Sequence, residues 1–238
     1  VGLLVGRPDR PVRRVLVALD VTPAVAAEAA ELGADLIVAH HPVMNVRWHE
    51  QELQTLREDT RLGGLLTYLV RHDLSAICMH TNLDAAEGGV NDCLAQKLGL
   101  SGTIPLNEQK IGRIGTLSCE IPLEQFLHDV VKSLGCRGLR YRSGGRPVRR
   151  VAVGGGACGE YIPQALAQGC DTFVTSDLRY NDFLDTQGLN LIDAGHFPTE
   201  DVVCAEVVRR LQKAFPDIRV SKSAVHHDAV QYYMTEGE

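Results

Sequence analysis

The sequence predicts an α/β fold made of two pseudo-repeated α/β units, with mixed, mostly parallel sheets flanked by helices. Three observations support this prediction. Short β-branched runs alternate with helical patterns along the chain, an order typical of a parallel sheet with helices on its faces. Several of these runs, such as Leu36–Ala39, are continuous in apolar residues, as expected for strands buried on both faces. The order of the elements also occurs twice.

The repeat appears when the sequence is shifted by 136 residues. Residues 12–41 then match residues 148–177 at nine of thirty positions without a gap. Gly33 and Gly169 occupy the same place in the two copies, where a helix commonly ends. Each copy is therefore predicted to form a strand, a helix and a second strand, at residues 14–19, 23–32 and 35–39 and again at 150–154, 160–168 and 171–175.

Beyond these segments the shift falls from 136 to 116 residues, so the first copy holds 20 additional residues within 42–70. This insertion has a helical pattern near Gln51–Asp59 and Leu65–Arg71. Each copy is expected to close with a helix, at Gly89–Leu98 and at Glu200–Ala214, and Thr199 is a suitable N-cap for the second of these.

The copies are joined by residues that predict a strand at Arg113–Glu120, a helix at Leu123–Leu134 and a connector at Gly138–Pro147. The repeat thus divides the chain into a first α/β unit at 1–103, a connecting segment at 104–147 and a second α/β unit at 148–238. We expect the three parts to form one domain.

Composition excludes several classes of protein. The chain has 238 residues and a formal net charge of −6, so it lacks the basic surface of a nucleic-acid-binding protein. No apolar run approaches the roughly 20 residues of a membrane-spanning helix. The seven cysteines form no C-x-x-C pair, which favours free thiols in a reducing cytoplasm over a disulfide framework or a zinc ribbon. A cytoplasmic location is therefore expected.

Candidate metal ligands follow three of the apolar runs. The pattern His-x-x-x-carboxylate occurs twice, as His80 with Asp84 and as His196 with Glu200, and the strand at 35–39 ends in His40-His41. Ligands in open α/β sheets bind beyond the carboxyl ends of the strands. Nitrogen and oxygen donors in this number exceed the needs of one tetrahedral zinc and suit two divalent ions.

The local geometry of these groups can also be predicted. Neighbouring side chains in a strand point to opposite faces, so the His40 and His41 rings can share a site only past the strand end, where Pro42 favours a turn. Asn82 and Asp84 are turn-forming residues, and we expect a loop between His80 and Asp84 rather than a helix.

A glycine-rich segment offers a different interpretation. Gly154–Gly159 reads G-x-G-x-x-G between a predicted strand and a predicted helix, and Asp177 follows near the position of a ribose-binding acid. Three interpretations remain open: a plain tight turn, a loop that binds a phosphate or another anion, or a dinucleotide site. The first copy has no glycines at the matching position, which disfavours the dinucleotide site.

Three other polar segments are candidates for weaker roles. Ser176–Asp182 either positions a substrate or is a solvated loop. His226-His227-Asp228 lacks the strand and turn that precede the other histidines, so we expect it at the surface. The basic residues of 137–150 are expected to form a solvated hairpin.

Together these motifs resemble the Nif-three-like family, whose members are known as GTP cyclohydrolase 1 type 2 homologues. The resemblance covers nearly the whole chain and rests on Gly33–Pro42, His80–Asp84 with Gly88–Asp92, Val174–Asp177, Asp193–His196 and Thr199-Glu200. It implies two divalent metal ions per subunit (Zn, Fe, Mn, Co or Ni) and a homohexamer. The ligands that it implies are His40, His41, Asp84, His196 and Glu200.

The function that follows is that of a GTP cyclohydrolase-like hydrolase, in which metal-activated water opens the guanine imidazole ring of GTP. His80 is the candidate proton shuttle, and Gly154–Gly159 or Arg179 is the candidate triphosphate contact. The alternatives are a metal-binding regulatory or interaction protein without catalysis, a hydrolase of another nucleotide or phosphorylated substrate, and a nucleotide-dependent oxidoreductase that uses the glycine loop.

Overall fold

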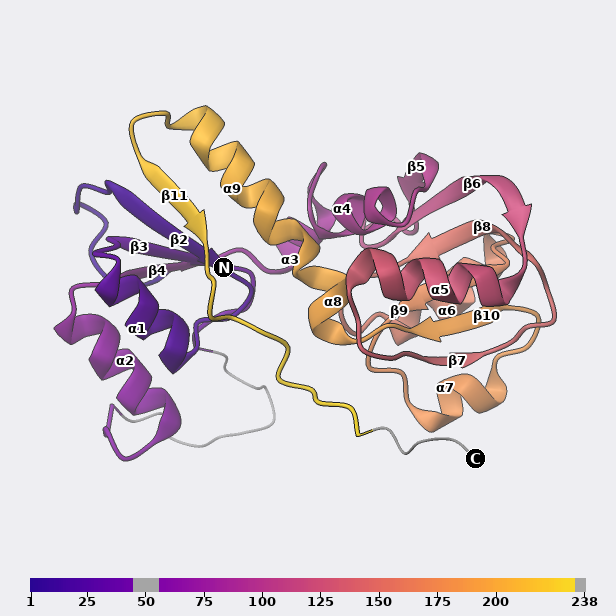
Figure 1. Cartoon of the computed structure of the whole chain (residues 1–238), viewed down its shortest axis with the longest axis horizontal. Helices are drawn as coiled ribbons and strands as arrows, with labels where there is room; N and C mark the ends of the chain where they lie inside the picture. Colours follow the sequence, from indigo (N-terminus) through magenta and orange to yellow (C-terminus); the bar gives the residue numbers. More distant parts are fainter. Residues whose placement is uncertain (45–55, 234–238) are drawn as a thin grey trace. The chain divides into compact units, whose positions relative to one another are not determined.

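A computed structural model describes residues 1–44 and 56–233 of the chain (Figure 1). These residues form two compact units. The first contains Val1–Leu83 and Cys204–His227, and the second contains Asp84–Val203 and the residues from Asp228 onward. The division at 1–103, 104–147 and 148–238 describes the repeat in the sequence and stays a prediction.

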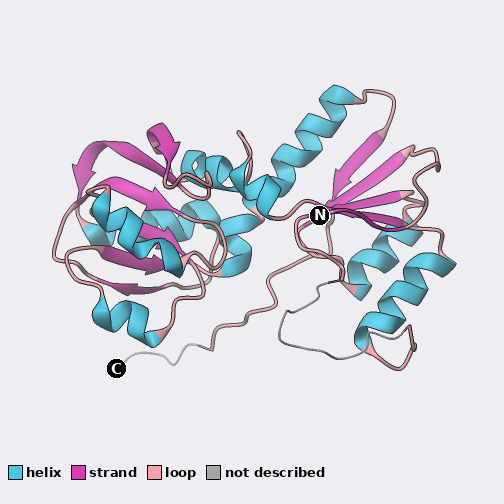
Figure 2. Cartoon of the chain, turned by 180° about the vertical axis from the view of Figure 1, so that it is seen from behind, coloured by secondary structure: helices cyan, strands magenta, loops and turns pink. Residues whose placement is uncertain are grey.

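The first unit contains a five-stranded sheet in the order β1-β4-β3-β2-β11. Only β1 and β4 pair antiparallel, and the other three neighbouring pairs are parallel. Two helices lie on the same side of this sheet (Figure 2). The strands are β1 (Gly2–Val5), β2 (Arg14–Ala18), β3 (Leu36–Ala39), β4 (Ser75–Cys78) and β11 (Arg219–Lys222), and the helices are α1 (Pro23–Glu31) and α2 (Arg61–Arg71).

The core of the first unit lies between these helices and the sheet. Val25 and Leu69, from α1 and α2, are fully buried against Leu16 and Ile37 of the sheet. The helix α1 begins where the Thr22 hydroxyl accepts a hydrogen bond from the Val25 amide at 3.2 Å, a common N-cap interaction. This packing fixes the ends of the strands that carry the candidate ligands.

The second unit contains a six-stranded sheet in the order β5-β6-β8-β9-β10-β7. The central strands β8, β9 and β10 are parallel, whereas β5, β6 and β7 pair antiparallel with their neighbours. The strands are β5 (Ser101–Pro105), β6 (Arg113–Ile121), β7 (Arg140–Arg142), β8 (Val148–Val153), β9 (Thr172–Thr175) and β10 (Asn190–Asp193).

Both faces of the second sheet are buried. Val153 and Val174 pack with Phe126 on one face, while Ala152 and Phe173 belong to a separate cluster on the other face. Side chains alternate between faces along a strand, so continuous apolar strands are required here. The helices of this unit are α4 (Val90–Lys97), α5 (Leu123–Leu134), the 3-10 turn Gly159–Tyr161 with α6 (Ile162–Ala167), α7 (Tyr180–Asp185) and α8 (His196–Glu200).

The predicted fold class is confirmed: the chain is α/β, with two mixed sheets flanked by helices. Most of the predicted elements are present with bounds shifted by a few residues, and α5 has the predicted bounds. The connector predicted at Gly138–Pro147 contains the short strand β7, which pairs antiparallel with β10. The basic residues near it therefore belong to the edge of the sheet and do not form a separate hairpin.

One short helix replaces the loop predicted between His80 and Asp84, and another precedes the predicted closing helix of the second copy. Residues between His80 and Asp84 form α3 (Thr81–Ala85), which opens with a hydrogen bond from the Leu83 amide to the His80 carbonyl at 2.7 Å. The closing helix of the second copy starts at His196 as α8 and continues as α9 (Val202–Ala214). Thr199 lies inside α8 and is not an N-cap, because its hydroxyl contacts the carbonyl oxygens of Gly195 and His196, each at 2.9 Å.

The helix expected at Gln51–Asp59 falls mainly outside the described residues. Its described part, residues 56–59, forms a turn before α2, because Thr60 caps that helix through the Gly63 amide. Among the helices of residues 1–44 and 56–233, none combines the length and the apolar character needed to cross a bilayer.

Candidate metal centre

Four neighbouring parallel strands of the first sheet end at the same edge. Ala18 pairs with Ala39 and Ala39 pairs with Cys78, so β2, β3 and β4 end side by side. The chain continues from these strands into polar residues: Asp20 after β2, His40 and His41 after β3, and His80 after β4. The edge thus gathers titratable side chains at the place where α/β folds bind ligands.

The three histidines of this edge form a compact cluster. The ring centroid of His40 lies 4.9 Å from that of His41 and 5.1 Å from that of His80, and the rings of His41 and His80 are 5.7 Å apart. One ring nitrogen from each histidine lies within 4.8 Å of the other two. This spacing suits imidazoles that coordinate a shared metal centre.

Hydrogen bonds orient the rings of this cluster. His40 donates from Nδ1 to the Met79 carbonyl at 2.8 Å, and His41 contacts Asp20 Oδ1 through Nδ1 at 2.8 Å. His80 Nδ1 lies 3.2 Å from the Thr81 hydroxyl. Metal-binding histidines generally use one ring nitrogen in this way, so Nε2 of His40 and of His41 is the atom that could coordinate a metal ion.

Asp20 is a residue of this edge that the motifs did not reveal. Burial raises the pKa of its carboxyl, but hydrogen bonds from His226 and His41 outweigh burial and hold that pKa well below its usual range. Asp20 directly follows the strand predicted at 14–19, as His40 follows the strand predicted at 35–39, and that position was the available signal.

His226 is buried, at 8% exposure, so its expected surface position is wrong. The reason is that β11 pairs in parallel with β2 and brings its carboxyl end to the same edge. His226 Nε2 lies 3.1 Å from Asp20 Oδ2, whereas the neighbouring His227 is exposed, as expected.

The second unit contains its own candidate ligands around His196. His196 Nδ1 lies 2.5 Å from Asp177 Oδ2, and its Nε2 lies 3.0 Å from Glu200 Oε2. His196 and Glu200 are four residues apart on α8, which places their side chains on one face of the helix. The hydrogen bond to Glu200 raises the pKa of His196 to about 9, with a further contribution from Asp177 and against the effect of burial. The proton on Nε2 therefore occupies the position that a bound cation would take.

Asp84 lies close to Glu200 in the same unit. Their carboxylate oxygens are within 4.8 Å of each other. Burial, followed by the charges of Asp84 and Glu200, raises the pKa of the Cys158 thiol to about 12. The two carboxylates that disfavour a thiolate at Cys158 form a site that favours cations.

Asp84 is fixed by the loop that follows it. Its carbonyl accepts a hydrogen bond from Asn91 Nδ2 at 3.0 Å. Arg113, only 5% exposed, forms a two-point contact with Asp92 at 2.5 and 3.1 Å and also donates to the Ala86 carbonyl. These buried contacts hold the segment between α3 and α4 in one conformation.

The glycine-rich segment is a tight turn against Glu200. A Cβ atom on Gly156 would lie 2.1 Å from Glu200 Oε1, and Gly156 has a φ of +66°. Its amide donates to the Thr199 hydroxyl at 3.1 Å, and the Gly155 amide donates to Asn91 Oδ1 at 2.9 Å. The amides of Gly154 and Cys158 also donate to protein oxygens. With these four amide donors used internally, the structure favours the tight-turn interpretation over an anion-binding loop or a dinucleotide site.

The other polar candidates of the second unit have local partners. Arg179 pairs with Asp182 at 3.0 Å at the start of α7. Asp177 has a left-handed φ of 54°, a strained conformation for a residue with a side chain, and it contacts His196. Arg142 donates to the carbonyls of Phe183 and Leu184 at the end of α7. Asp177 is thus the member of Ser176–Asp182 that contacts a candidate ligand.

Comparisons with known proteins agree with the fold and the motifs. Residues 1–229 match the family described as Duf34/NIF3 (NGG1p interacting factor 3). The chain is 32% identical to a GTP cyclohydrolase 1 type 2 homolog of Clostridium perfringens over 90% of this chain and 83% of the relative. It is 33% identical to a GTP cyclohydrolase 1 type 2 homolog of Streptomyces coelicolor over 84% of this chain and 73% of that relative.

Solved structures extend the match to the fold. A Bacillus cereus protein related to NIF3 superposes with a TM-score of 0.89 and 26% identity, covering 98% of this chain and 93% of the other. A Staphylococcus aureus hypothetical protein superposes with a TM-score of 0.89 and 30% identity, covering 98% of this chain and 91% of the other. The chain therefore belongs to the Duf34/NIF3 family.

Proposed function

We propose that the protein is a dinuclear metal-dependent hydrolase of the GTP cyclohydrolase type. The observation that carries this proposal is the common orientation of the histidines. His40, His41 and His196 each use Nδ1 in a hydrogen bond to a carbonyl or carboxylate oxygen, as metal-binding histidines do.

The donor set fits a pair of divalent ions. We propose His40, His41, Asp84, His196 and Glu200 as the ligands. Three imidazoles and two carboxylates suit Zn, Fe, Mn, Co or Ni and exceed the coordination of one tetrahedral ion.

Such ions would lower the pKa of water and stabilise negative charge that develops on the substrate. The protein side chains would position the ions and would transfer protons. Asp20 and Asp177 hold the Nδ1 protons of His41 and His196. His80 is the proposed proton shuttle. Its Nε2 would accept one proton of the water that adds to C8 of guanine and would give it to N9 as the C8–N9 bond breaks, while the second proton goes to N7, which keeps C8 as a formyl group.

The proposed substrate is a nucleotide, and GTP is the first candidate because the curated relatives carry the name GTP cyclohydrolase 1 type 2 homolog. Four amides of Gly154–Gly159 and the Arg179 side chain have partners within the chain. We therefore propose no residue for the triphosphate.

The test combines metal analysis with turnover. Freshly purified protein is expected to contain two divalent ions per chain and to convert GTP to a ring-opened product, followed by chromatography. His41→Ala and Glu200→Ala should each lose metal and turnover, while His128→Ala, at an exposed position of α5, should retain both. Metal without turnover on any nucleotide would favour a non-catalytic metal-binding protein. Protein without metal affinity would refute the proposal.

We also propose a homohexamer, which the family resemblance implies. Light scattering should then give a mass near six times the 26.0 kDa of one chain. A monomer or dimer at micromolar concentration would contradict this proposal and leave the metal assignment intact.

A further inference from the structure

We propose that His226 is a positioning residue of the metal centre, which acts on the ligand His41 through Asp20. This inference rests on the proposed function and extends it to a segment near the C-terminus. Three side chains carry it: His226 holds one oxygen of the Asp20 carboxylate, and His41 holds the other.

The order of the strands places these groups in a row. The first sheet runs β4-β3-β2-β11 in parallel. The polar residues beyond the ends of these strands follow the same order, which is His80, His40 with His41, Asp20 and His226. Each neighbouring pair of strands therefore supplies one contact of the row, and His226 forms its outer end.

Asp20 needs a second partner to hold a fixed orientation. Its side chain is 41% exposed, whereas that of His226 is 5% exposed. A carboxylate so accessible to water can rotate and exchange its partners. Because Asp20 Oδ2 is held by a buried imidazole at 3.1 Å, Oδ1 stays directed at His41 Nδ1, and the His41 ring keeps its Nε2 toward the cluster.

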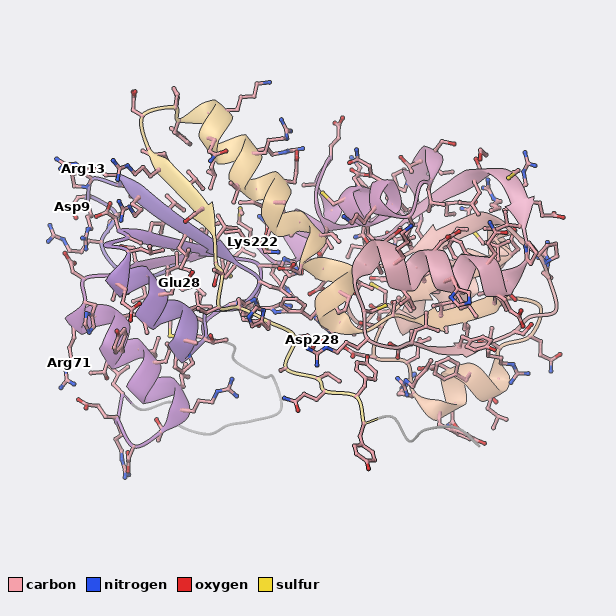
Figure 3. The ribbon with its side chains drawn as sticks, viewed as in Figure 1. Asp9, Arg13, Glu28, Arg71, Lys222 and Asp228 are labelled. Atoms are coloured by element: carbon pink, nitrogen blue, oxygen red, sulfur yellow. The ribbon has the colours of Figure 1, made fainter. Side chains whose placement is uncertain are left out.

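His226 is itself anchored by the segment that follows β11. The Ser223 amide donates to the Val17 carbonyl at 2.8 Å, and the Ser223 hydroxyl donates to Glu28 Oε2 at 2.5 Å. The His226 amide donates to the Ser223 hydroxyl at 3.2 Å. Figure 3 labels Glu28 on α1 and Lys222 at the end of β11, the two elements that this anchor joins.

In the second unit, too, a carboxylate holds Nδ1 of a candidate ligand histidine. There Asp177 holds His196 Nδ1 at 2.5 Å, so a carboxylate supports a candidate ligand in each unit. Removing such a partner typically weakens metal binding by roughly 10–100-fold. His226 differs in acting one contact further from the metal, so its effect should be smaller and should depend on Asp20.

The test measures Co²⁺ affinity of the full chain by visible absorption, with a competing chelator. Asp20→Ala should weaken binding by roughly 10–100-fold, and His226→Leu should weaken it several-fold. His226→Gln retains a side-chain N–H donor and should restore most of the affinity. His227→Leu, at the exposed neighbour, should bind as the wild type does. Thermal unfolding of each metal-free variant checks that it folds.

A double-mutant cycle separates positioning from general stability. Adding His226→Leu to Asp20→Ala should cause no further loss of affinity, because the contact is already absent. Wild-type affinity in His226→Leu, or losses that add fully in the double variant, would overturn this inference and leave the proposed function standing. A wild-type chain that binds no Co²⁺ would overturn the proposed function and this inference with it.

Discussion

The packing of Gly156 against Glu200 gives a prediction that separates stability from metal binding. Gly156→Ala places a methyl group 2.1 Å from Glu200 Oε1, in a backbone with a φ of +66°. The carboxylate is the flexible end of its side chain, and it must move to admit the methyl group. The substitution therefore displaces a proposed ligand without altering its chemistry.

The cost in stability follows from the backbone. A left-handed φ costs an alanine roughly 1–2 kcal/mol, and the lower conformational entropy of the unfolded chain offsets about 0.4–1 kcal/mol of this. The free energy of unfolding should thus fall by about 1 kcal/mol. Metal affinity should fall by at least roughly tenfold, the smallest effect usual when even a hydrogen-bond partner of a ligand is removed.

Gly169→Ala is the matched control. Gly169 has a similar φ of +71°, but a Cβ atom there has no neighbour within 4 Å. This variant should lose a similar amount of stability in urea unfolding and should keep the wild-type Co²⁺ affinity. Equal metal affinities for Gly156→Ala and Gly169→Ala would refute the assignment of Glu200 as a ligand held by this turn.

Two further predictions concern charge. The pKa of His196 is raised from 6.5 to about 9, so its contribution to the stability of the metal-free protein is complete below pH 6.5 and is lost as the pH rises through 9. Thermal unfolding from pH 6 to 10 should show this decline in the wild type and not in His196→Gln, and equal profiles would contradict it. Arg113→Ala leaves Asp92 without its buried partner and should lower the free energy of unfolding in urea by about 3–5 kcal/mol. Arg209→Ala, which breaks an exposed pair with Glu206 on α9, should cost below about 1 kcal/mol, and similar losses for the two arginines would refute the argument.

The strands and the outlines of the two sheets were predictable because a strand that is buried on both faces must be apolar at consecutive positions. Ala152 and Val153 are neighbours in β8 and belong to opposite clusters, so both had to be apolar. The short helix α8 was not predictable in the same way. The closing helix was predicted to begin at Glu200, yet Pro198 is the third residue of α8, within the first turn, where an amide hydrogen is not needed for the helix.

The glycine-rich segment shows a second limit of sequence patterns. Glycines allow a backbone to approach a phosphate, and they equally allow a side chain to approach the backbone. Only the identity of the neighbour distinguishes the two cases. At Gly156 that neighbour is Glu200, some forty residues away in the sequence, and local spacing contains no information about it. The same reasoning explains why the contact between Asp20 and His226, which depends on the pairing of β2 with β11, left no motif.

One aligned position of the repeat holds different residue types in the two copies. His41 of the first copy corresponds to Asp177 of the second at the shift of 136 residues. His41 is a proposed ligand supported by Asp20, whereas Asp177 is itself the support, bound to His196. A single exchange of imidazole for carboxylate at this position therefore converts a ligand into the partner of a ligand. The first copy thus supplies most of the proposed imidazole ligands. Asp177→His should place a ligand where a supporting carboxylate is required, and should weaken Co²⁺ binding despite adding a donor.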